Sequence, residues 1–441
     1  MQFDETLPDT LAHMGIPALN TMQETALPAI QHHPNVVLLA PTGSGKTLAF
    51  LLPVWSLMKQ EERGVQCLIL SPTRELAIQI ERVWQKMATG FKVNTCYGGH
   101  SMPIETQNLS SPPALLIGTP GRIVEHLNRK TFSPDSIRML VLDEFDKSLS
   151  MGFQDFMSDI LKRLPAVEKR IMVSATDKLS IPSFTGVINP KILNFNKEAE
   201  KSTDGLILKK VVSPGEDKRV TLFRLLCLLG GEPTLIFCNQ RDTTEVVTRF
   251  LAEKGIQAAH FHGGLEQLDR EKTLVQFRNG STLFLVASDL AARGLDIPEV
   301  KNVVHYELPP KHTDFLHRNG RTARMHTTGT AFLLVGPNEP LPVYLETEPE
   351  PLDVPPADTL PEPSPWTTLY ISGGKKDKLS KTDIVGFLTQ KGHAQKDDIG
   401  IIELMDFMSF VAVKKAGVAD LLKAIQPEKM KGKKYKIVEN N

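Results

Sequence analysis

The chain has 441 residues, a formal net charge of zero at pH 7 and 41% hydrophobic residues. This length allows about three domains with cores of their own, and the neutral balance excludes a protein that coats nucleic acid through overall positive charge. The four scattered cysteines form no C-x-x-C pair, and no apolar run approaches the roughly 18–20 residues of a membrane span. Because the acidic start also lacks the features of a secretory leader, we expect a reduced cytoplasmic protein without membrane contact.

The first motif follows a helical N-terminal region, residues 1–34, and a short apolar strand over 35–39. A glycine-rich turn then leads into an apolar helix predicted over 48–58. The turn consists of Ala40, Pro41, Thr42, Gly43, Ser44, Gly45, Lys46 and Thr47. Strand, glycine-rich turn and helix in this order are typical of a phosphate-binding loop.

The residue types of this turn suit a polyphosphate. Gly43 and Gly45 let the backbone turn tightly and aim its N–H groups at phosphate oxygens, and the helix adds the positive end of its dipole. Lys46 has the reach to contact the β- and γ-phosphates, and Thr47 can bind Mg²⁺ through its hydroxyl. Ala40 stands where the general pattern has glycine, so the turn matches the AxTGxGKT variant.

Apolar strands alternate with amphipathic helices over the next 130 residues or so, and each strand ends in a polar cluster. The strands are expected over 67–70, 114–117, 139–142 and 171–173. Continuous apolar runs indicate strands that are buried on both faces, as in a doubly wound parallel sheet. In such a sheet the carboxyl ends of the strands form the ligand crevice, which places the polar clusters together.

A second α/β series follows a polar stretch over 196–205 and contains no phosphate-binding loop. Its strands are expected over 234–237, 258–261, 283–286, 303–306 and 331–335. Residues 337–365 then hold seven acids, ten prolines and no Lys or Arg, which predicts an extended acidic spacer. Residues 366–441 hold 14 Lys against nine acids, and their pattern predicts a βαββαβ domain of the kind used by RNA-recognition modules.

These clusters supply what an NTPase needs besides the loop. Asp143 ends an apolar strand and is the expected Mg²⁺ partner, and Glu144 beside it is the expected general base. Arg321 and Arg324 lie three residues apart on one side of a helical turn. If the two α/β domains close on the nucleotide, these guanidinium groups can neutralise charge at the γ-phosphate.

Together these motifs resemble, in order and spacing, those of the DEAD-box family of superfamily 2 RNA helicases over about residues 3–335. Asp143-Glu144-Phe145-Asp146 resembles the tetrad that names the family, with Phe145 in place of Ala. The resemblance implies two RecA-like domains, residues 1–200 and 206–336, followed by the linker 337–365 and the domain 366–441. It also implies that Ser174, Ala175 and Thr176 couple the ATP and RNA sites.

The resemblance implies ATP and Mg²⁺ as cofactors, and it assigns further residues. Gln23 resembles the glutamine that reads adenine, Phe3 the aromatic residue that stacks on the base, and Asp296 a nucleotide-binding residue of the fifth motif. The positions that resemble RNA contacts of the two domains are Pro72, Thr73, Arg74, Gly98, Gly99, Thr119, Pro120, Gly121, Arg122, Gly263, Gln267, Arg270 and Ser288.

The C-terminal region resembles the RNA-binding domain of DbpA-type helicases. In that subfamily the domain docks on a hairpin of large-subunit ribosomal RNA, so Lys375, Lys376, Lys378, Lys433 and Lys434 are expected to contact phosphates. Tyr370 and Phe410 are open to two interpretations, stacking on a base or packing in the core.

The resulting expectation is a monomeric ATP-dependent RNA helicase that acts on ribosomal precursor particles during large-subunit assembly. Two alternatives stay open at this point. One is a general helicase of mRNA turnover or cold adaptation, and the other is an RNA chaperone or clamp without catalysis. The clamp would need a broken catalytic set, whereas Lys46, Asp143, Glu144, Arg321 and Arg324 are all present.

Overall fold

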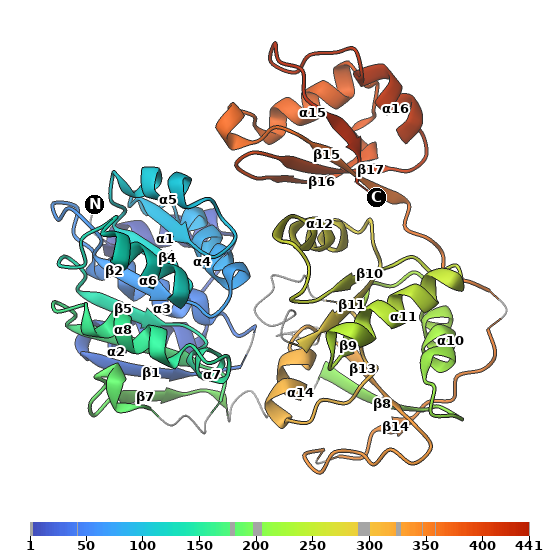
Figure 1. Ribbon diagram of the computed structural model, residues 1–441, viewed down its shortest axis with the longest axis horizontal. Coiled ribbons are helices and arrows are strands. Elements are labelled where there is room, and N and C mark those ends of the chain that lie inside the picture. Colours follow the sequence, from blue (N-terminus) through green and yellow to red (C-terminus); the bar gives the residue numbers. More distant parts are fainter. Residues whose placement is uncertain are drawn as a thin grey trace. The chain divides into compact units, whose positions relative to one another are not determined.

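The computed structural model describes residues 3–41, 43–176, 181–196, 205–289, 300–322, 328–345, 347–357 and 359–440. These residues form two compact units, one from the described residues up to 196 and one from those from 205 onward (Figure 1). Thr42, Asp296 and Arg324, three of the predicted site residues, lie outside the described residues. In the described part of the chain, every helix is too short or too polar to cross a membrane.

The first unit is built on a seven-stranded parallel sheet with the order β3-β4-β2-β5-β6-β1-β7. Its strands are β1 (Asn35–Leu39), β2 (Cys67–Leu70), β3 (Val93–Cys96), β4 (Leu115–Gly118), β5 (Met139–Leu142), β6 (Lys169–Ser174) and β7 (Lys191–Asn194). Its helices are α1 (Phe3–His13), α2 (Thr21–His32), α3 (Lys46–Leu57), α4 (Arg74–Met87), α5 (Met102–Leu109), α6 (Pro120–Arg129), α7 (Phe145–Ser150) and α8 (Gln154–Lys162).

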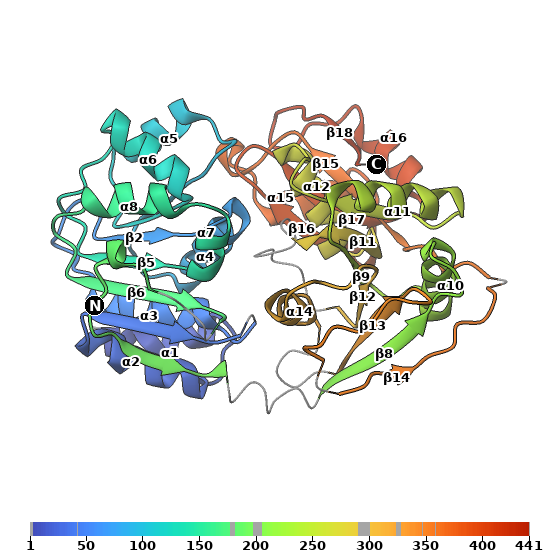
Figure 2. The ribbon, with the colours of Figure 1, turned by 60° about the horizontal axis from the view of Figure 1, so that its bottom comes forward.

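Each face of this sheet has its own apolar core, because alternate strand residues point to opposite faces. In β1, Val36 and Leu38 join the core beneath α1–α4, whereas Val37 and Leu39 join the core beneath α5–α8 (Figure 2). Phe145, the residue that departs from the family tetrad, is fully buried in the second of these cores. Its ring therefore serves packing and leaves the neighbouring carboxylates in place.

The second unit contains another seven-stranded parallel sheet, with the order β10-β11-β9-β12-β13-β8-β14. Its strands are β8 (Leu206–Val212), β9 (Thr234–Cys238), β10 (Ala258–Phe261), β11 (Phe284–Ser288), β12 (Asn302–His305), β13 (Gly329–Val335) and β14 (Glu350–Pro351). The helices around it include α10 (Arg219–Leu229), α11 (Arg241–Glu253), α12 (Gln267–Arg278) and α14 (His312–Asn319).

The acidic segment 337–365 is extended, as predicted, but it packs along this unit. Glu350 and Pro351 form β14, the seventh strand of this sheet, which pairs with β8. Leu352 then donates its N–H to the Lys210 carbonyl at 2.8 Å. Leu352 and Val354 also pack against the core beneath α10 and α11. The described part of the segment is therefore a strap on the second unit.

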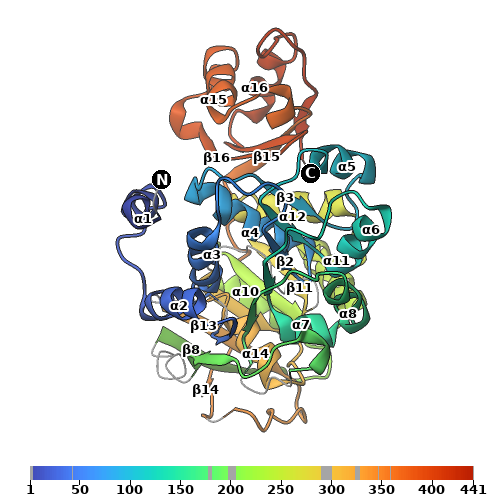
Figure 3. The same cartoon turned by 90° about the vertical axis from the view of Figure 1, so that its left-hand side faces the viewer.

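The second unit ends in a small antiparallel sheet with the order β16-β17-β15-β18. Its elements are β15 (Trp366–Ile371), α15 (Lys381–Gln390), β16 (Ile399–Leu404), β17 (Ser409–Lys414), α16 (Val418–Ile425) and β18 (Ile437–Glu439). Both helices cover one face of this sheet, where Leu369, Ile371, Val411 and Val413 form the core (Figure 3). The predicted βαββαβ order, and with it the predicted fold class, is confirmed.

Candidate nucleotide and RNA sites

The glycine-rich turn joins β1 to α3, as predicted. Gly43 and Gly45 have φ angles of +85° and +87°, a conformation that favours glycine. Lys46 is the first residue of α3, and its buried ammonium donates to the Ala40 carbonyl at 2.6 Å. A second hydrogen bond crosses the turn, because the Ser44 hydroxyl donates to the Pro41 carbonyl at 2.8 Å. Thr47 follows on the first turn of the helix.

Gln23 lies directly against this turn. It forms a capping box with Asn20 at the start of α2, and its amide Nε2 donates to the Gly45 carbonyl at 3.3 Å. Asn20 in turn donates to the Ser44 carbonyl at 3.0 Å. A β-carbon at Gly45 would meet the Gln23 amide, and the φ angle of +87° strains any other residue, so glycine is favoured there. The two polar side chains therefore fix the position of α2 relative to the turn.

Phe3 packs edge-on against Trp55 of α3, with the ring centroids 4.9 Å apart. The ring thus contacts the end of the core beneath α1–α4. Adenine stacking by Phe3 and adenine reading by Gln23 stay predictions.

Asp143 and Glu144 follow β5 and are both about 5% exposed. Burial, with the neighbouring Glu144 charge, raises the pKa of Asp143 to about 7. Burial likewise lowers the pKa of Lys46, although the Glu144 charge opposes this effect. Glu144 has a φ angle of +45° and forms a buried ion pair with Lys147. Two carboxylates and two ammonium groups thus form one buried cluster next to the turn.

The donor set of this cluster fits a nucleotide with Mg²⁺. A carboxyl whose charged form is destabilised by burial and a like charge gains from a divalent cation beside it. The glycine turn leads directly into α3, and the Thr47 hydroxyl lies one residue from Lys46 on its first turn. The residues present therefore match the predicted ATP and Mg²⁺ chemistry.

Ser174 ends β6 and contacts the same turn, and Ala175 and Thr176 follow it. The Ser174 carbonyl accepts from the Ala40 N–H at 3.1 Å. The Ser174 hydroxyl accepts from the Thr176 N–H at 3.1 Å, which holds the three residues in a compact bend. The structure thus links this tripeptide to the nucleotide loop through one backbone hydrogen bond.

The predicted RNA contacts of the first unit come together at the carboxyl ends of β2, β3 and β4. Thr73 caps α4 by accepting from the Leu76 N–H at 3.3 Å. Arg74 lies so close to Gly99 that a β-carbon there would meet its guanidinium, and Gly99 has a φ angle of +90°. Arg122 donates from Nε to the Tyr97 carbonyl at 3.1 Å and from Nη2 to the His100 carbonyl.

The other predicted contacts of this unit occupy the same ends of the strands. Pro72 follows β2, and Gly98 lies beside Gly99 in the turn after β3. Thr119, Pro120 and Gly121 start α6, where the Thr119 N–H donates to the Cys96 carbonyl at 3.1 Å. An added β-carbon at Gly98 or Gly121 would meet no atom within 4 Å, so both glycines border open space.

The predicted contacts of the second unit cluster around α12. Arg270 is about 9% exposed, and its guanidinium lies 5.3 Å from the centroid of the Phe261 ring. Gln267 donates to Glu271 one turn further along the helix at 2.8 Å. Gly263 follows β10 and borders open space, and Ser288 is buried at the end of β11. Arg270 therefore packs in the unit through most of its side chain.

Arg321 is about 4% exposed, immediately after α14. The sequence did not single out Arg318, three residues earlier, yet its guanidinium is completely buried. It forms an ion pair with Asp289 at 2.5 Å and donates to Asn239 at 2.7 Å. Together, burial and the Arg318 charge lower the pKa of His305 to about 3. The spacing of basic residues alone gave no signal that the Arg318 guanidinium is held by this ion pair and hydrogen bond.

Two lysine-rich segments of the small domain, residues 375–378 and 431–434, contact each other, as a joint role in phosphate binding requires. Lys433 pairs with Asp377 at 2.5 Å, and the Lys431 ammonium donates to the Lys378 carbonyl at 2.8 Å. Besides Lys433, the exposed lysines in these segments that were predicted to bind RNA are Lys375, Lys376, Lys378 and Lys434. They lie on and directly after η3 (Lys375–Asp377) and on the chain before β18, and these five lysines are called the lysine surface below.

The sheet face opposite the two helices of the small domain is not open. Tyr370, Phe410 and Glu403 are register partners across β15, β17 and β16, so their side chains share this face. Phe410 is completely buried, and Tyr370 packs edge-on against it at 5.7 Å. Of the two interpretations for these rings, packing is the one that Phe410 follows.

The end of α12 covers this face within the second unit (Figure 1). Arg278 donates to Glu403 through two nitrogens, at 2.6 and 2.5 Å. Asn279 donates to the Thr368 hydroxyl at 2.9 Å. These contacts attach the small domain to the parallel-sheet part of the unit through its sheet, which leaves the lysine surface exposed.

Comparison with known proteins matches three family models to the chain. They are the DEAD/DEAH box helicase model over residues 20–181, the helicase conserved C-terminal domain over 217–326 and the DbpA RNA binding domain over 368–439. The ATP-dependent RNA helicase DbpA of Escherichia coli is 34% identical over 97% of this chain and 95% of its own length. The chain belongs to the DEAD-box family of ATP-dependent RNA helicases. It has the domain content of the DbpA type.

Two further relatives agree with this assignment. The ATP-dependent rRNA helicase RRP3 of Encephalitozoon cuniculi is 36% identical over 76% of this chain and 84% of its own length. The structure of S. cerevisiae Dbp5 bound to RNA and ADP BeF3 is 26% identical, with a TM-score of 0.70 over 80% of this chain and 96% of that chain. The two parallel-sheet parts of this helicase are therefore RecA-like, and the enzyme is an ATP-dependent RNA helicase.

Proposed function

We propose that this helicase unwinds short RNA duplexes locally during assembly of the large ribosomal subunit, as a monomer, with residues 366–441 docked on a ribosomal RNA hairpin. The observation that carries the target is the exposed lysine surface of the small domain, whose sheet face is already packed on α12. A dedicated basic module implies a dedicated site on structured RNA. That one relative is named an rRNA helicase supports the same class of target.

We propose that the first unit binds the ATP. In this proposal the backbone N–H groups of the glycine turn and Lys46 hold the phosphates, while Thr47 and Asp143 hold Mg²⁺. The metal ion supplies positive charge at the β- and γ-phosphate oxygens. Glu144 takes the proton of the attacking water, for which its ion pair with Lys147 has to open. Gln23 and Phe3 select adenine.

We propose that ATP and RNA together draw the two RecA-like domains into a closed state in which Arg321 and Arg324 reach the γ-phosphate. The RNA strand is held by the N–H groups and side chains at the strand ends of both domains. Such contacts recognise phosphates and sugars and carry no sequence information. Target choice therefore falls to the small domain. The domain limits proposed for this division of labour are 1–200, 206–336, 337–365 and 366–441.

RNA-stimulated ATP hydrolysis, measured with a panel of ribosomal RNA fragments, tests the proposal. We expect strong stimulation by one large-subunit hairpin and its loss when residues 366–441 are deleted. Equal stimulation by any RNA would point instead to a general helicase of mRNA turnover or cold adaptation. Hydrolysis with none of the RNAs would point to a clamp.

A further inference from the structure

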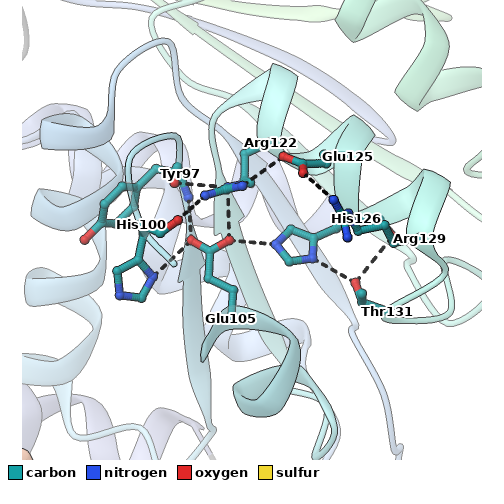
Figure 4. A network of polar contacts seen from close by, with 8 residues as sticks. All are labelled: Tyr97, His100, Glu105, Arg122, Glu125, His126, Arg129 and Thr131. Carbon is teal, nitrogen blue, oxygen red and sulfur yellow. Dashed lines mark hydrogen bonds and ion pairs between the residues drawn. The ribbon is translucent and has the colours of Figure 1, made fainter. Parts of the chain in front are cut away.

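A buried carboxylate in the first unit lies outside every motif used so far. Glu105 on α5 is about 1% exposed, and its two oxygens accept from four groups (Figure 4). Burial alone would raise the pKa of Glu105, but its hydrogen bonds and the Arg122 charge lower it to about 2. Glu105 is therefore a charged group inside the protein, which is stable only while its partners stay in place.

Two of these partners lie on either side of the diglycine segment. The Tyr97 N–H and His100 Nδ1 both contact Glu105 Oε1, each at 3.2 Å. Arg122 binds the carbonyls of the same two residues. Gly98–Gly99 is thus fixed at both ends by contacts of Tyr97 and His100, and its side that borders open space is left uncovered.

The other two partners come from α6, the helix that begins with the predicted RNA contacts Thr119, Pro120 and Gly121. His126 Nε2 lies 2.7 Å from Glu105 Oε2, and Arg122 Nε lies 3.1 Å from the same oxygen. His126 is completely buried, and its other ring nitrogen lies 2.8 Å from the Thr131 hydroxyl. One carboxylate therefore ties the diglycine segment to α6.

Cys96 lies near Glu105 and His126, within 4.8 Å ligand to ligand, so a metal site is the competing interpretation. The Arg122 guanidinium argues against it, because it already occupies the Glu105 oxygen that a cation would share with His126. Burial also raises the pKa of the Cys96 thiol, which disfavours the thiolate that a metal needs.

We propose that Glu105 and His126 are positioning residues for RNA binding, which hold Gly98–Gly99 and the start of α6 in one fixed geometry toward the RNA backbone. Neither side chain touches RNA. The gain is preorganisation. Without these contacts the two segments would move separately, and RNA binding would have to order both of them. This inference rests on the proposed RNA contacts of the first unit.

Steady-state ATPase kinetics of the full chain test the inference. Glu105→Ala removes all four contacts, and we expect the KM for single-stranded RNA to rise about tenfold, with kcat at saturating RNA and the KM for ATP changed less than twofold. Glu125→Ala is the matched control, because Glu125 also pairs with Arg122 but is exposed and does not reach the diglycine segment. We expect it to change the KM for RNA less than twofold. An unchanged KM for RNA in Glu105→Ala, or an equal rise in the KM for ATP, would overturn the inference.

A second variant covers the case in which Glu105→Ala does not fold. His126→Phe keeps a ring in the same space and leaves the link between Glu105 and the diglycine segment. It removes one of the two contacts between Glu105 and α6, because Arg122 still binds the carboxylate. We expect a rise of about threefold or more in the KM for RNA, and no rise would contradict the inference. Arg74→Ala separates the two levels of the proposal. If Arg74→Ala also leaves RNA binding unchanged, the proposed RNA surface itself is wrong, whereas a loss in Arg74→Ala alone rejects only the role of Glu105.

Discussion

Asp143 is the residue at which stability and function conflict most clearly. Its pKa of about 7 in the folded protein lies above the ordinary aspartate value of 3.8. The folded state therefore keeps a proton that the unfolded state loses between about pH 4 and pH 7. In this window stability falls as the pH rises, and above pH 7 the full cost of the buried charge is present.

Asp143→Asn should consequently stabilise the nucleotide-free protein at pH 8 while abolishing ATP hydrolysis. Three pKa units correspond to at most about 4 kcal/mol, so we expect a gain of about 1–4 kcal/mol in the free energy of unfolding of the first unit. Thermal unfolding at pH 8 and pH 5 measures it as a rise in Tm that is much smaller at the lower pH. Asp155→Asn, on the exposed first turn of α8, is the control. A Tm that falls at pH 8 would show that the Asp143 charge is already compensated.

Residues with a chemical signature in the sequence were predictable, and residues with a purely spatial role were not. The glycine turn with Lys46 announces its chemistry through spacing, and it is found between β1 and α3 as expected. Glu105, His126 and Arg318 have no such pattern. Glu105 lies 21 residues from His126, and Arg318 lies 29 residues from Asp289, so only the folded chain brings these groups together.

At the scale of elements, strands with a clear apolar run were predicted almost to the residue, whereas strands with a weaker apolar signal, such as β7 and β14, were missed. β1, β2, β5 and β10 are found where the apolar runs predicted them. β7 and β14 lie at sheet edges, where one side needs no apolar partner, so their residues carry little hydrophobic signal. The strand β14 was hidden further by its proline, which is tolerated at an edge.

The contact between α12 and the small domain gives an element-scale prediction. Arg278→Glu places two acids opposite each other at the sheet face and should release the small domain from α12. Because the lysine surface stays intact, we expect hairpin binding to be unchanged and unwinding of an adjacent duplex to slow by about five- to fiftyfold. Combining it with Glu403→Arg restores an ion pair and should recover most of the rate.

The control for this swap reverses a charge of the same unit in an exposed pair. Lys301 and Glu232 are 3.1 Å apart with both side chains about half exposed, and such pairs contribute little. Lys301→Glu should leave the unwinding rate within twofold of the unmodified enzyme. If Arg278→Glu behaves in the same way as Lys301→Glu, attachment of the small domain through its sheet is not required for unwinding.

At the scale of the whole molecule, the neutral total charge hides a division between parts. Residues 366–441 carry an excess of five positive charges, so the first 365 residues carry an excess of five negative ones. The two ways of holding RNA should therefore respond differently to salt. Backbone N–H contacts at strand ends release few counterions, whereas lysines that neutralise phosphates release about one for each contact.

The affinity for the hairpin should accordingly fall steeply as the salt concentration rises, and the contacts of the lysine surface should account for this fall. Neutralising three phosphates predicts a loss of about 40-fold in affinity between 50 and 200 mM salt. Changing Lys375, Lys376 and Lys434 together to Gln should weaken hairpin binding at 50 mM salt and make the affinity less dependent on salt. The affinities of the variant and the unmodified protein should therefore become similar at 200 mM salt. These lysines are exposed, so the substitutions leave the core of the domain untouched. Titrations of a fluorescent hairpin measure both slopes. Equal slopes for the two proteins would mean that RNA docks on another face of the small domain, and the division of labour between its lysines and the RecA-like domains would have to be abandoned.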